Sequence, residues 1–309
     1  MGTGNFTVQD WTSYATKNVN NKSTEEIYTA STMDSEFDPK GVMRESRDSD
    51  DHPNSTPIII GLDVTGSMSD ILQAVATQLG DLVLQILDRK PVDDPQIMFN
   101  AIGDARCGDR YPLQCTQFES DIRIAEQLTQ LFFEEGGGGN GFESYPLTWY
   151  FAANHTSIDS FEKRNKKGFI FTMGDDSYPE VLTRDEIKRI FGEDIEKDSL
   201  PISEVLSQVN RKYEVFHLCL KEGWNMAHGW NPNSGEQVIA DWKAILGERA
   251  IPVSDYRKVP QIIVSILESM AGKSLDDIVA SWDGSTGIVV REALAGLTTK
   301  TANSELVEF

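Results

Sequence analysis

Residues 63–67, Asp-Val-Thr-Gly-Ser, carry three oxygen-bearing side chains at alternate positions. Carboxylate and hydroxyl oxygens are hard ligands, and Mg²⁺ in proteins takes about six such ligands while keeping some waters. The pattern therefore predicts that Asp63, Thr65 and Ser67 form part of a binding site for Mg²⁺, with Mn²⁺ or Ca²⁺ as alternatives. The same residue types also occur in a simple turn that caps a helix, so that alternative stays open.

The elements around this segment are those of an α/β fold. Residues 58–62 form a short apolar run typical of a buried parallel strand, and apolar residues recur at helical spacing from 71 to 87. Further strands are expected at 96–102, 113–118, 168–173, 213–220 and 250–253, and further helices at 122–133, 146–153, 238–246 and 259–270. This alternation predicts a doubly wound, mostly parallel sheet flanked by helices, a fold that binds ligands at the carboxyl ends of its strands.

Residues 57–68, with the strand before them and the helix after, resemble the metal-ion-dependent adhesion site of von Willebrand factor A (VWA) domains. The first motif of that family is Asp-x-Ser-x-Ser. Here Thr65 keeps a hydroxyl at the first serine position, and Ser67 stands at the second. The resemblance extends over roughly residues 57–272 and implies a VWA, Rossmann-like fold of an intracellular bacterial type, with a variant metal site.

The resemblance implies that a second loop supplies a further ligand. In the family this loop usually carries a threonine, and residues 136–144, Gly-Gly-Gly-Gly-Asn-Gly-Phe-Glu-Ser, are similar to a Gly-Gly-Asp-x-Pro-Glu-like variant. Because no threonine is present, Asn140 is the first candidate by position, with Glu143 and Ser144 as alternatives. The glycines do not fit a dinucleotide-binding loop, since no Gly-x-Gly-x-x-Gly opens a helix directly after the first strand.

The third loop departs from the pattern of the family. Its members commonly have Thr-Asp-Gly at this strand end, whereas residues 172–174 are Thr-Met-Gly and are followed by Asp175 and Asp176. A thioether is a poor ligand for Mg²⁺, so Asp175 is the expected ligand and Asp176 the alternative. Asp104, which follows the expected strand at 96–102, either supports this site or closes a turn.

The formal net charge is −21, from 28 basic and 49 acidic residues. Nucleic-acid binding depends on Lys and Arg that neutralise phosphates, so this balance argues against nucleic acid and favours cations or basic protein surfaces. No stretch reaches the roughly 18–20 apolar residues of a membrane-spanning helix, and the first residues contain no apolar signal core. We therefore expect no membrane contact and a cytoplasmic location. The three cysteines lack metal-finger spacing and are expected to be free thiols.

The chain divides into an N-terminal arm (1–56), a VWA-like domain (57–272) and a C-terminal tail (273–309). The arm is polar, but it contains several aromatic residues that would leave large apolar surfaces in water if the arm were free. We therefore expect an extended arm that packs through Trp11, Tyr14, Tyr28 and Phe37, on its own domain or, as the alternative, on a partner.

The resemblance implies a metal-dependent protein-binding module that recruits or scaffolds a partner, and not an enzyme. In this family an acidic side chain of the partner completes the shell of the ion, and intracellular bacterial members often work beside AAA-type ATPases or in defence assemblies. Two alternatives stay open: a metal-assisted hydrolase that uses Asp63, Asp175 and Asp176, and a structural subunit with a vestigial site. The sequence offers the hydrolase no evident general base.

Overall fold

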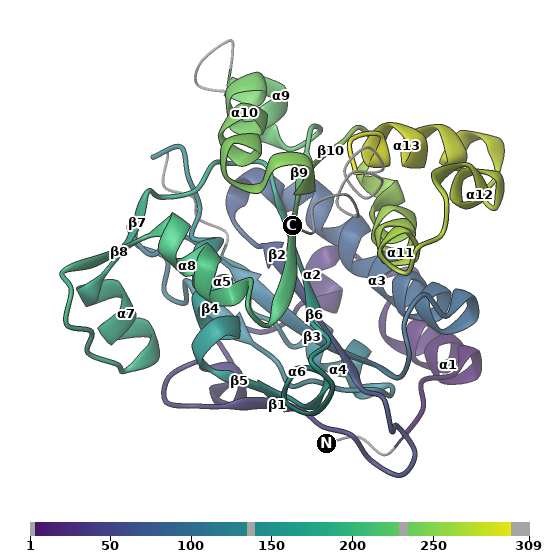
Figure 1. Cartoon of the computed structure of the whole chain (residues 1–309), viewed down its shortest axis with the longest axis horizontal. Coiled ribbons are helices and arrows are strands. Elements are labelled where there is room, and N and C mark those ends of the chain that lie inside the picture. The colour runs from purple at the N-terminus through teal and green to yellow at the C-terminus, as the bar shows by residue number, and fades with distance from the viewer. Residues whose placement is uncertain (1–3, 135–139, 229–233, 298–309) are drawn as a thin grey trace, which may run out of the picture.

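The computed structural model describes residues 4–134, 140–228 and 234–297. A six-stranded sheet lies at its centre, with the strand order β10-β9-β6-β2-β3-β4 (Figure 1). All neighbouring pairs are parallel except β3 and β4 at one edge. The strands are β2 (Thr56–Asp63), β3 (Pro95–Ile102), β4 (Leu113–Cys115), β6 (Gly168–Gly174), β9 (Tyr213–Leu220) and β10 (Ala250–Val253). The prediction of a mostly parallel central sheet is confirmed.

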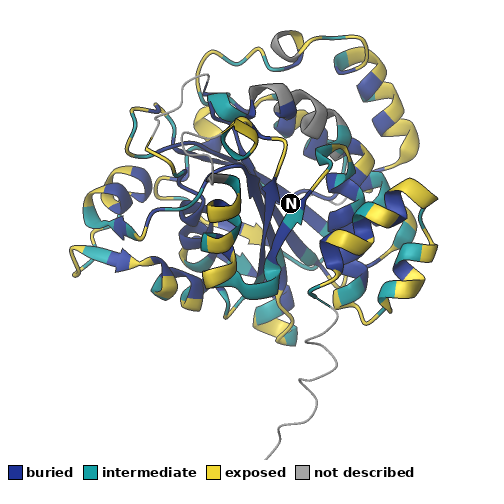
Figure 2. Cartoon of the chain, turned by 90° about the horizontal axis from the view of Figure 1, so that it is seen from above, coloured by how far each residue is buried: buried dark blue, intermediate teal, exposed yellow. Residues whose placement is uncertain are grey.

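Helices cover both faces of this sheet, and alternate residues of each strand face opposite layers. In β2, Ile58 and Ile60 belong to the core shared with helices α3 and α11, whereas Ile59 belongs to the core shared with α5, α8 and α10. Figure 2 shows the buried strands enclosed between helices whose outer surfaces are exposed. These helices are α3 (Ser69–Arg89), α11 (Val259–Met270), α5 (Pro146–Asn154), α8 (Ile202–Val209) and α10 (Ser234–Leu246).

Several smaller elements connect the main ones, and the sequence patterns did not predict most of them. The helix expected at 122–133 is shorter, and the strand expected at 113–118 ends at Cys115. The smaller elements between β4 and α10 are α4 (Arg123–Thr129), β5 (Thr156–Ile158), α6 (Asp159–Arg164), β7 (Val181–Thr183), α7 (Arg184–Phe191), β8 (Ser199–Pro201) and α9 (Trp224–His228). No helix among the described residues is long and apolar enough to cross a bilayer.

The N-terminal arm packs on the domain, as its aromatic residues predicted, although part of it is helical rather than extended. Its elements are α1 (Val8–Asn18), α2 (Thr24–Ile27) and β1 (Arg44–Ser46). Trp11 lies against α3 at Gly80, where an added Cβ would come within 2.0 Å of the indole ring. Tyr28 stacks on Phe133 with ring centroids 4.0 Å apart, and Phe37 is buried.

Replacing Trp11 with Ala is expected to lower the free energy of unfolding by about 2 kcal/mol, because a large buried ring would lose its contacts. Val8 on the same helix is 66% exposed and provides the control, since its replacement by Ala should change stability by less than about 0.5 kcal/mol. Chemical denaturation measures both values. Equal unfolding curves for the two variants would contradict the packing of the arm.

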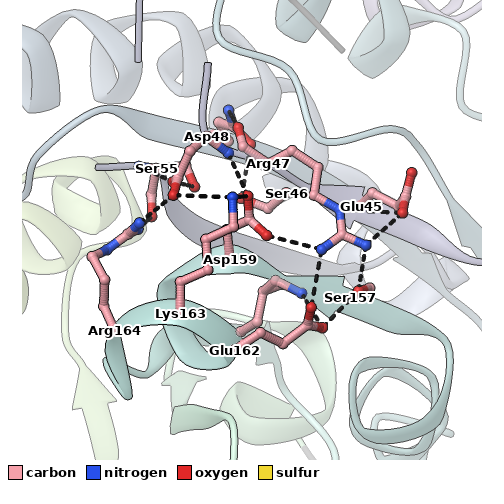
Figure 3. Close-up of polar contacts among 12 residues, drawn as sticks. Glu45, Ser46, Arg47, Asp48, Ser55, Ser157, Asp159, Glu162, Lys163 and Arg164 are labelled. Carbon is pink, nitrogen blue, oxygen red and sulfur yellow. Dashed lines mark hydrogen bonds and ion pairs between the residues drawn. The ribbon is translucent and has the colours of Figure 1, made fainter. Parts of the chain in front are cut away.

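A network of charged side chains joins the arm to α6 at the end of the sheet where β2 and β6 begin (Figure 3). The carboxylate of Asp159 accepts hydrogen bonds from Arg47 Nη1 at 2.9 Å, Lys163 Nζ at 2.6 Å and the backbone N–H of Asp48 at 2.9 Å. Burial opposes ionisation, but these donors outweigh it and lower the pKa of Asp159 to about 2. Asp48 in turn accepts from Arg164, so the arm is joined to α6 by ionised pairs.

The C-terminal segment is helical as far as the structure describes it, to residue 297. Helices α12 (Leu275–Ala280) and α13 (Gly284–Leu294) contribute Ile278, Val290 and Leu294 to the core that contains α11. The guanidinium of Arg89 lies over the Trp282 ring, 3.9 Å from its centroid, and pairs with Glu268. Residues 273–297 therefore pack as part of the domain rather than as a separate tail.

Candidate metal centre

The carboxyl ends of three neighbouring strands bring the candidate residues together. In the sheet register Leu62 of β2 is opposite Met173 of β6, and Asp63 is opposite Ile102 of β3. The loops that follow these strands therefore start side by side, as a parallel sheet requires. The first loop continues through the short 3₁₀ turn η2 (Gly66–Met68) into α3.

Four of the expected ligands form one continuous chain of close contacts. Asp63 Oδ1 accepts hydrogen bonds from the backbone N–H of Thr65 at 3.0 Å and from its hydroxyl at 2.6 Å. Ser67 Oγ donates to Asp175 Oδ1 at 2.8 Å. The two hydroxyl oxygens, Thr65 Oγ1 and Ser67 Oγ, lie 3.3 Å apart and close the chain.

The two hydroxyls are also within hydrogen-bond distance of each other, and either could be the donor. A hydroxyl oxygen has one proton and two lone pairs, and in the arrangement in which Thr65 and Ser67 both donate to carboxylates neither proton points to the other hydroxyl. Lone pairs on both oxygens are therefore available to a cation. Two adjacent ligands of an octahedral Mg²⁺ ion lie about 3 Å apart when each is about 2.1 Å from the metal. The observed 3.3 Å fits such a pair.

The carboxylates of this edge are buried together, and the pKa shifts reflect that. Burial is the largest cause that raises the pKa of Asp63 to about 7, and the nearby charge of Asp175 is the second. Burial also raises the pKa of Asp175, and burial followed by the charge of Asp175 raises the pKa of Asp176 to about 7. Within the described ranges, none of the three forms an ion pair with Lys, Arg or His. A bound cation would offset this accumulation of negative charge.

In the second loop, Asn140 does not join the hydrogen-bonded chain of Asp63, Thr65, Ser67 and Asp175. Asn140 is exposed and its side-chain amide donates to Asp104 Oδ2. Asp104 also accepts from the backbone of Arg106 at 2.8 Å, so it belongs to the neighbouring turn. Ser144 Oγ accepts from the backbone N–H of Ala105 at 2.9 Å. The glycine run at 136–139 lies outside the described residues.

Glu143 is the residue of the second loop that faces the buried acids. It is 4% exposed, and among the described atoms its Oε2 is buried without a hydrogen-bond partner. Burial and then the charges of Asp63, Asp104 and Asp176 raise the pKa of Glu143 to about 11. A buried carboxylate oxygen without a donor is costly unless it is protonated or meets a cation. Its raised pKa keeps Glu143 protonated near neutral pH in the absence of a cation, and its burial distinguishes it from the exposed Asn140.

The third loop brings Asp175 to the hydroxyls because Gly174 allows an unusually close approach. A Cβ at residue 174 would lie 2.0 Å from the hydroxyl oxygen of Tyr145 and 2.7 Å from Asp63 Oδ2. Met173 points into the core and cannot serve as a ligand. The second oxygen of Asp175 accepts from the backbone N–H of Asn225 at 2.8 Å.

Two residues of this site carried no sequence signal. The hydroxyl of Tyr145 donates to Asp63 Oδ2 at 2.6 Å, although the two residues are 82 positions apart. Asn225, at the start of α9, binds Asp175 through its backbone and Asp176 through its side-chain amide. No motif marks either position, because each acts by holding a carboxylate rather than by a recognisable spacing.

Comparisons with known proteins leave the family open. No family model and no curated protein matches the chain. The pilus adhesin SpaC from Lactobacillus rhamnosus GG in its open conformation is similar in structure, with a TM-score of 0.45, 10% identity, and coverage of 78% of this chain and 31% of that one. Proximal thread matrix protein 1 from the mussel byssus is also similar in structure, with a TM-score of 0.44, 9% identity, and coverage of 70% of this chain and 48% of that one. The chain thus spans 31% and 48% of the length of these two proteins. These TM-scores decide neither family nor function.

Within the described ranges, this edge of the sheet does not form a metal site from His, Cys, Asp and Glu side chains alone. Among the described residues, no three His, Cys, Asp or Glu side chains are arranged so that they could hold a metal ion. Any cation at this edge would therefore depend on the oxygens of Thr65 and Ser67 and on water. Cys107, Cys115 and Cys219 form no disulfide bond among the described residues, as the sequence predicted.

His217 lies in the core beside Tyr145, with ring centroids 4.9 Å apart. It is fully buried, stacks on Trp242 with centroids 3.6 Å apart, and contacts the hydroxyl of Thr172 through Nδ1 at 2.9 Å. Burial lowers the pKa of His217 well below its ordinary value, so the ring is neutral. The indole N–H of Trp242 donates to the backbone carbonyl of Asp176 at 2.9 Å, which fixes the third loop.

Proposed function

We propose that the protein is a VWA-like, doubly wound α/β domain that binds a protein partner through a divalent ion. One observation carries this proposal. The hydroxyl oxygens of Thr65 and Ser67 lie 3.3 Å apart, and each hydroxyl donates a hydrogen bond to a carboxylate. This arrangement leaves lone pairs on both oxygens for a cation. A turn that only capped a helix would direct these hydroxyls to backbone N–H groups instead.

The residues that would hold the ion are all oxygen donors. They are Asp63, Thr65, Ser67 and Asp175, with water at the remaining positions; Asn140 is left out because its side-chain amide donates to Asp104. This donor set suits Mg²⁺, with Mn²⁺ or Ca²⁺ as alternatives. When bound, the ion would supply a positive centre that attracts an oxygen ligand.

The partner we propose is a protein that presents an acidic side chain to this ion. The surrounding carboxylates and the net charge of −21 would repel an acidic partner in the absence of the ion. Binding would therefore depend on metal. An AAA-type ATPase or a defence assembly remains part of this proposal through the family resemblance alone. Capture of the partner with Mg²⁺ and its release by a chelator is the test.

Mg²⁺ is expected to raise the melting temperature, and to raise it more at about pH 8 than at about pH 6. Asp63 and Asp176 have pKa values raised to about 7, chiefly by burial, so protons compete with the ion at the lower pH. Their protonation stabilises the ion-free fold fully below the ordinary pKa of 3.8, and this contribution is lost as the pH rises through about 7. The ion replaces it at high pH.

Thermal melts with and without Mg²⁺ at both pH values measure this effect. The ion-free melting temperature should fall between about pH 5 and pH 8, and Mg²⁺ should restore it. An equal effect of Mg²⁺ at both pH values would argue against carboxylate ligands. No effect at either pH would argue against the ion site.

A further inference from the structure

A pocket lies at the amino ends of β2 and β6, at the opposite end of the sheet from the candidate metal centre. Its volume is about 260 Å³, and it forms where the start of β2, the loop between α3 and β3, the segment from α6 to β6 and the end of α11 meet. Its lining combines the basic residues Arg164, Lys166 and Lys167 with apolar residues that include Phe169 and Met270. The pocket therefore offers both positive charge and apolar surface.

The basic residues of this pocket come from a short, ordered turn. Four basic residues occupy the five positions 163–167, in a chain that has 28 basic and 49 acidic residues in total. Asn165 ends α6 in the left-handed conformation, with a φ of 53°. The backbone N–H of Lys166 donates to the carbonyl of Ser160 at 2.8 Å, which closes the turn. The positive charges are thus held at the pocket by defined backbone geometry.

The ion pairs of this turn show how much of its positive charge is free. Three of its four basic residues are paired with acidic neighbours, and the first two pairs are drawn in Figure 3: Lys163 with Asp159, Arg164 with Asp48, and Lys167 with Glu214. Lys166 is exposed and forms no ion pair within the described part of the chain. Asp93, which is also exposed, lines the pocket from the α3–β3 loop and would repel a ligand with several negative charges. The charges therefore favour a single negative group beside Lys166.

The apolar part of the lining gives such a ligand a body. Phe169 is half-buried, Leu267 is fully buried and Met270 is 37% exposed, and all three line the pocket. An apolar cavity of about 150 Å³ holds one benzene ring, so by proportion this pocket of about 260 Å³ accommodates about ten non-hydrogen atoms. Octanoate is a carboxylate of this size.

We propose that this pocket binds a small monoanion with an apolar body, of the size of a medium-chain carboxylate. The negative head group would lie at the mouth beside Lys166, and the apolar body would lie against Phe169 and Met270. This site is independent of the proposed ion site, because none of the candidate metal ligands lines the pocket.

The test titrates octanoate, octanamide and acetate into the full-length chain. Octanamide has the same apolar body without the charge, and acetate has the charge without the body. The ¹³C-labelled methyl group of Met270, identified by its absence from Met270→Leu, reports binding by NMR. Met43 is 52% exposed and does not line the pocket, so its methyl group reports non-specific binding. Octanoate should shift the Met270 signal saturably, leave Met43 unchanged, and bind at least about fivefold more tightly than either other probe.

Lys166→Gln should lower the preference for octanoate over octanamide by about two- to fivefold, the range of one exposed ion pair. Lys221→Gln is the matched control and should leave the preference unchanged, because Lys221 is exposed and follows the carboxyl end of β9. Asp93→Asn should raise the preference, because it removes the opposing charge. All three residues are exposed, so the variants are expected to fold.

Three results would overturn the proposal. They are the absence of a Met270 shift at octanoate concentrations up to about 10 mM, an equal shift of Met43, and equal affinities of the wild type for octanoate and octanamide. None of these results bears on the ion site, which is tested separately by titration of Mg²⁺.

Discussion

Binding of Mg²⁺ is expected to disappear from calorimetric titrations when Asp63 is replaced by Ala, a loss of at least about 100-fold in affinity. Asp63 provides a negative charge next to the Thr65 hydroxyl, and it also accepts a hydrogen bond from that hydroxyl. Without this acceptor the Thr65 hydroxyl can rotate and direct its proton toward the ion. The variant therefore loses a charge and the orientation of a second ligand together.

The Asp63→Ala variant is expected to remain folded. Burial raises the pKa of Asp63 to about 7, which means that the ionised carboxylate is unfavourable in the absence of an ion. Asp63→Asn keeps the shape of the side chain and should lose Mg²⁺ binding as well. Asp159→Ala is the matched control, because it removes another buried aspartate at the opposite end of the sheet and should leave Mg²⁺ binding unchanged. Equal heats of binding for wild type and Asp63→Ala would refute the site.

Asp175→Asn is expected to weaken Mg²⁺ binding by about 100-fold, and Asp176→Asn by less than about tenfold. Asp175 accepts a hydrogen bond from the Ser67 hydroxyl. Asp176 instead accepts one from the side-chain amide of Asn225, and none of its described hydrogen bonds involves Thr65 or Ser67. Both residues lie in the same loop and both are buried, so each variant serves as the control for the other.

Paired titrations of these two variants decide which carboxylate of the third loop serves the ion. A larger loss from Asp176→Asn would reverse the assignment. No loss from either would mean that the first two loops and water hold the ion alone. Metal-dependent capture of the partner should follow the same order as the affinities, because the partner is proposed to bind the ion itself.

The strands that position the site could be predicted from sequence because they are buried on both faces. β2, β6 and β9 are mostly apolar runs of a length typical of parallel strands. The three-residue strands β1, β5, β7 and β8 are too short to produce a periodic pattern. The helices between β5 and β9 were missed because each has at most eight residues.

The residues of the candidate site also divide into those that the sequence could predict and those that it could not. Asp63, Thr65 and Ser67 are predictable because they are local in sequence, and Asp175 because it follows a strand end. Tyr145 and Asn225 act through contacts over 82 and 50 positions, and no spacing rule reaches that far. In the second loop, position alone favoured Asn140 over Glu143. Burial, which the sequence did not reveal, distinguishes them.

The attachment of the arm has a consequence for the order in which the chain can fold. Arg47 pairs with Asp159, which is 112 positions later, and β1 pairs with β5. At about 5–20 residues per second, a nascent arm waits roughly ten seconds for these partners to be synthesised. The arm, although synthesised first, therefore cannot be fully attached before residue 159 has been made, while β6, β9 and β10 are still to come.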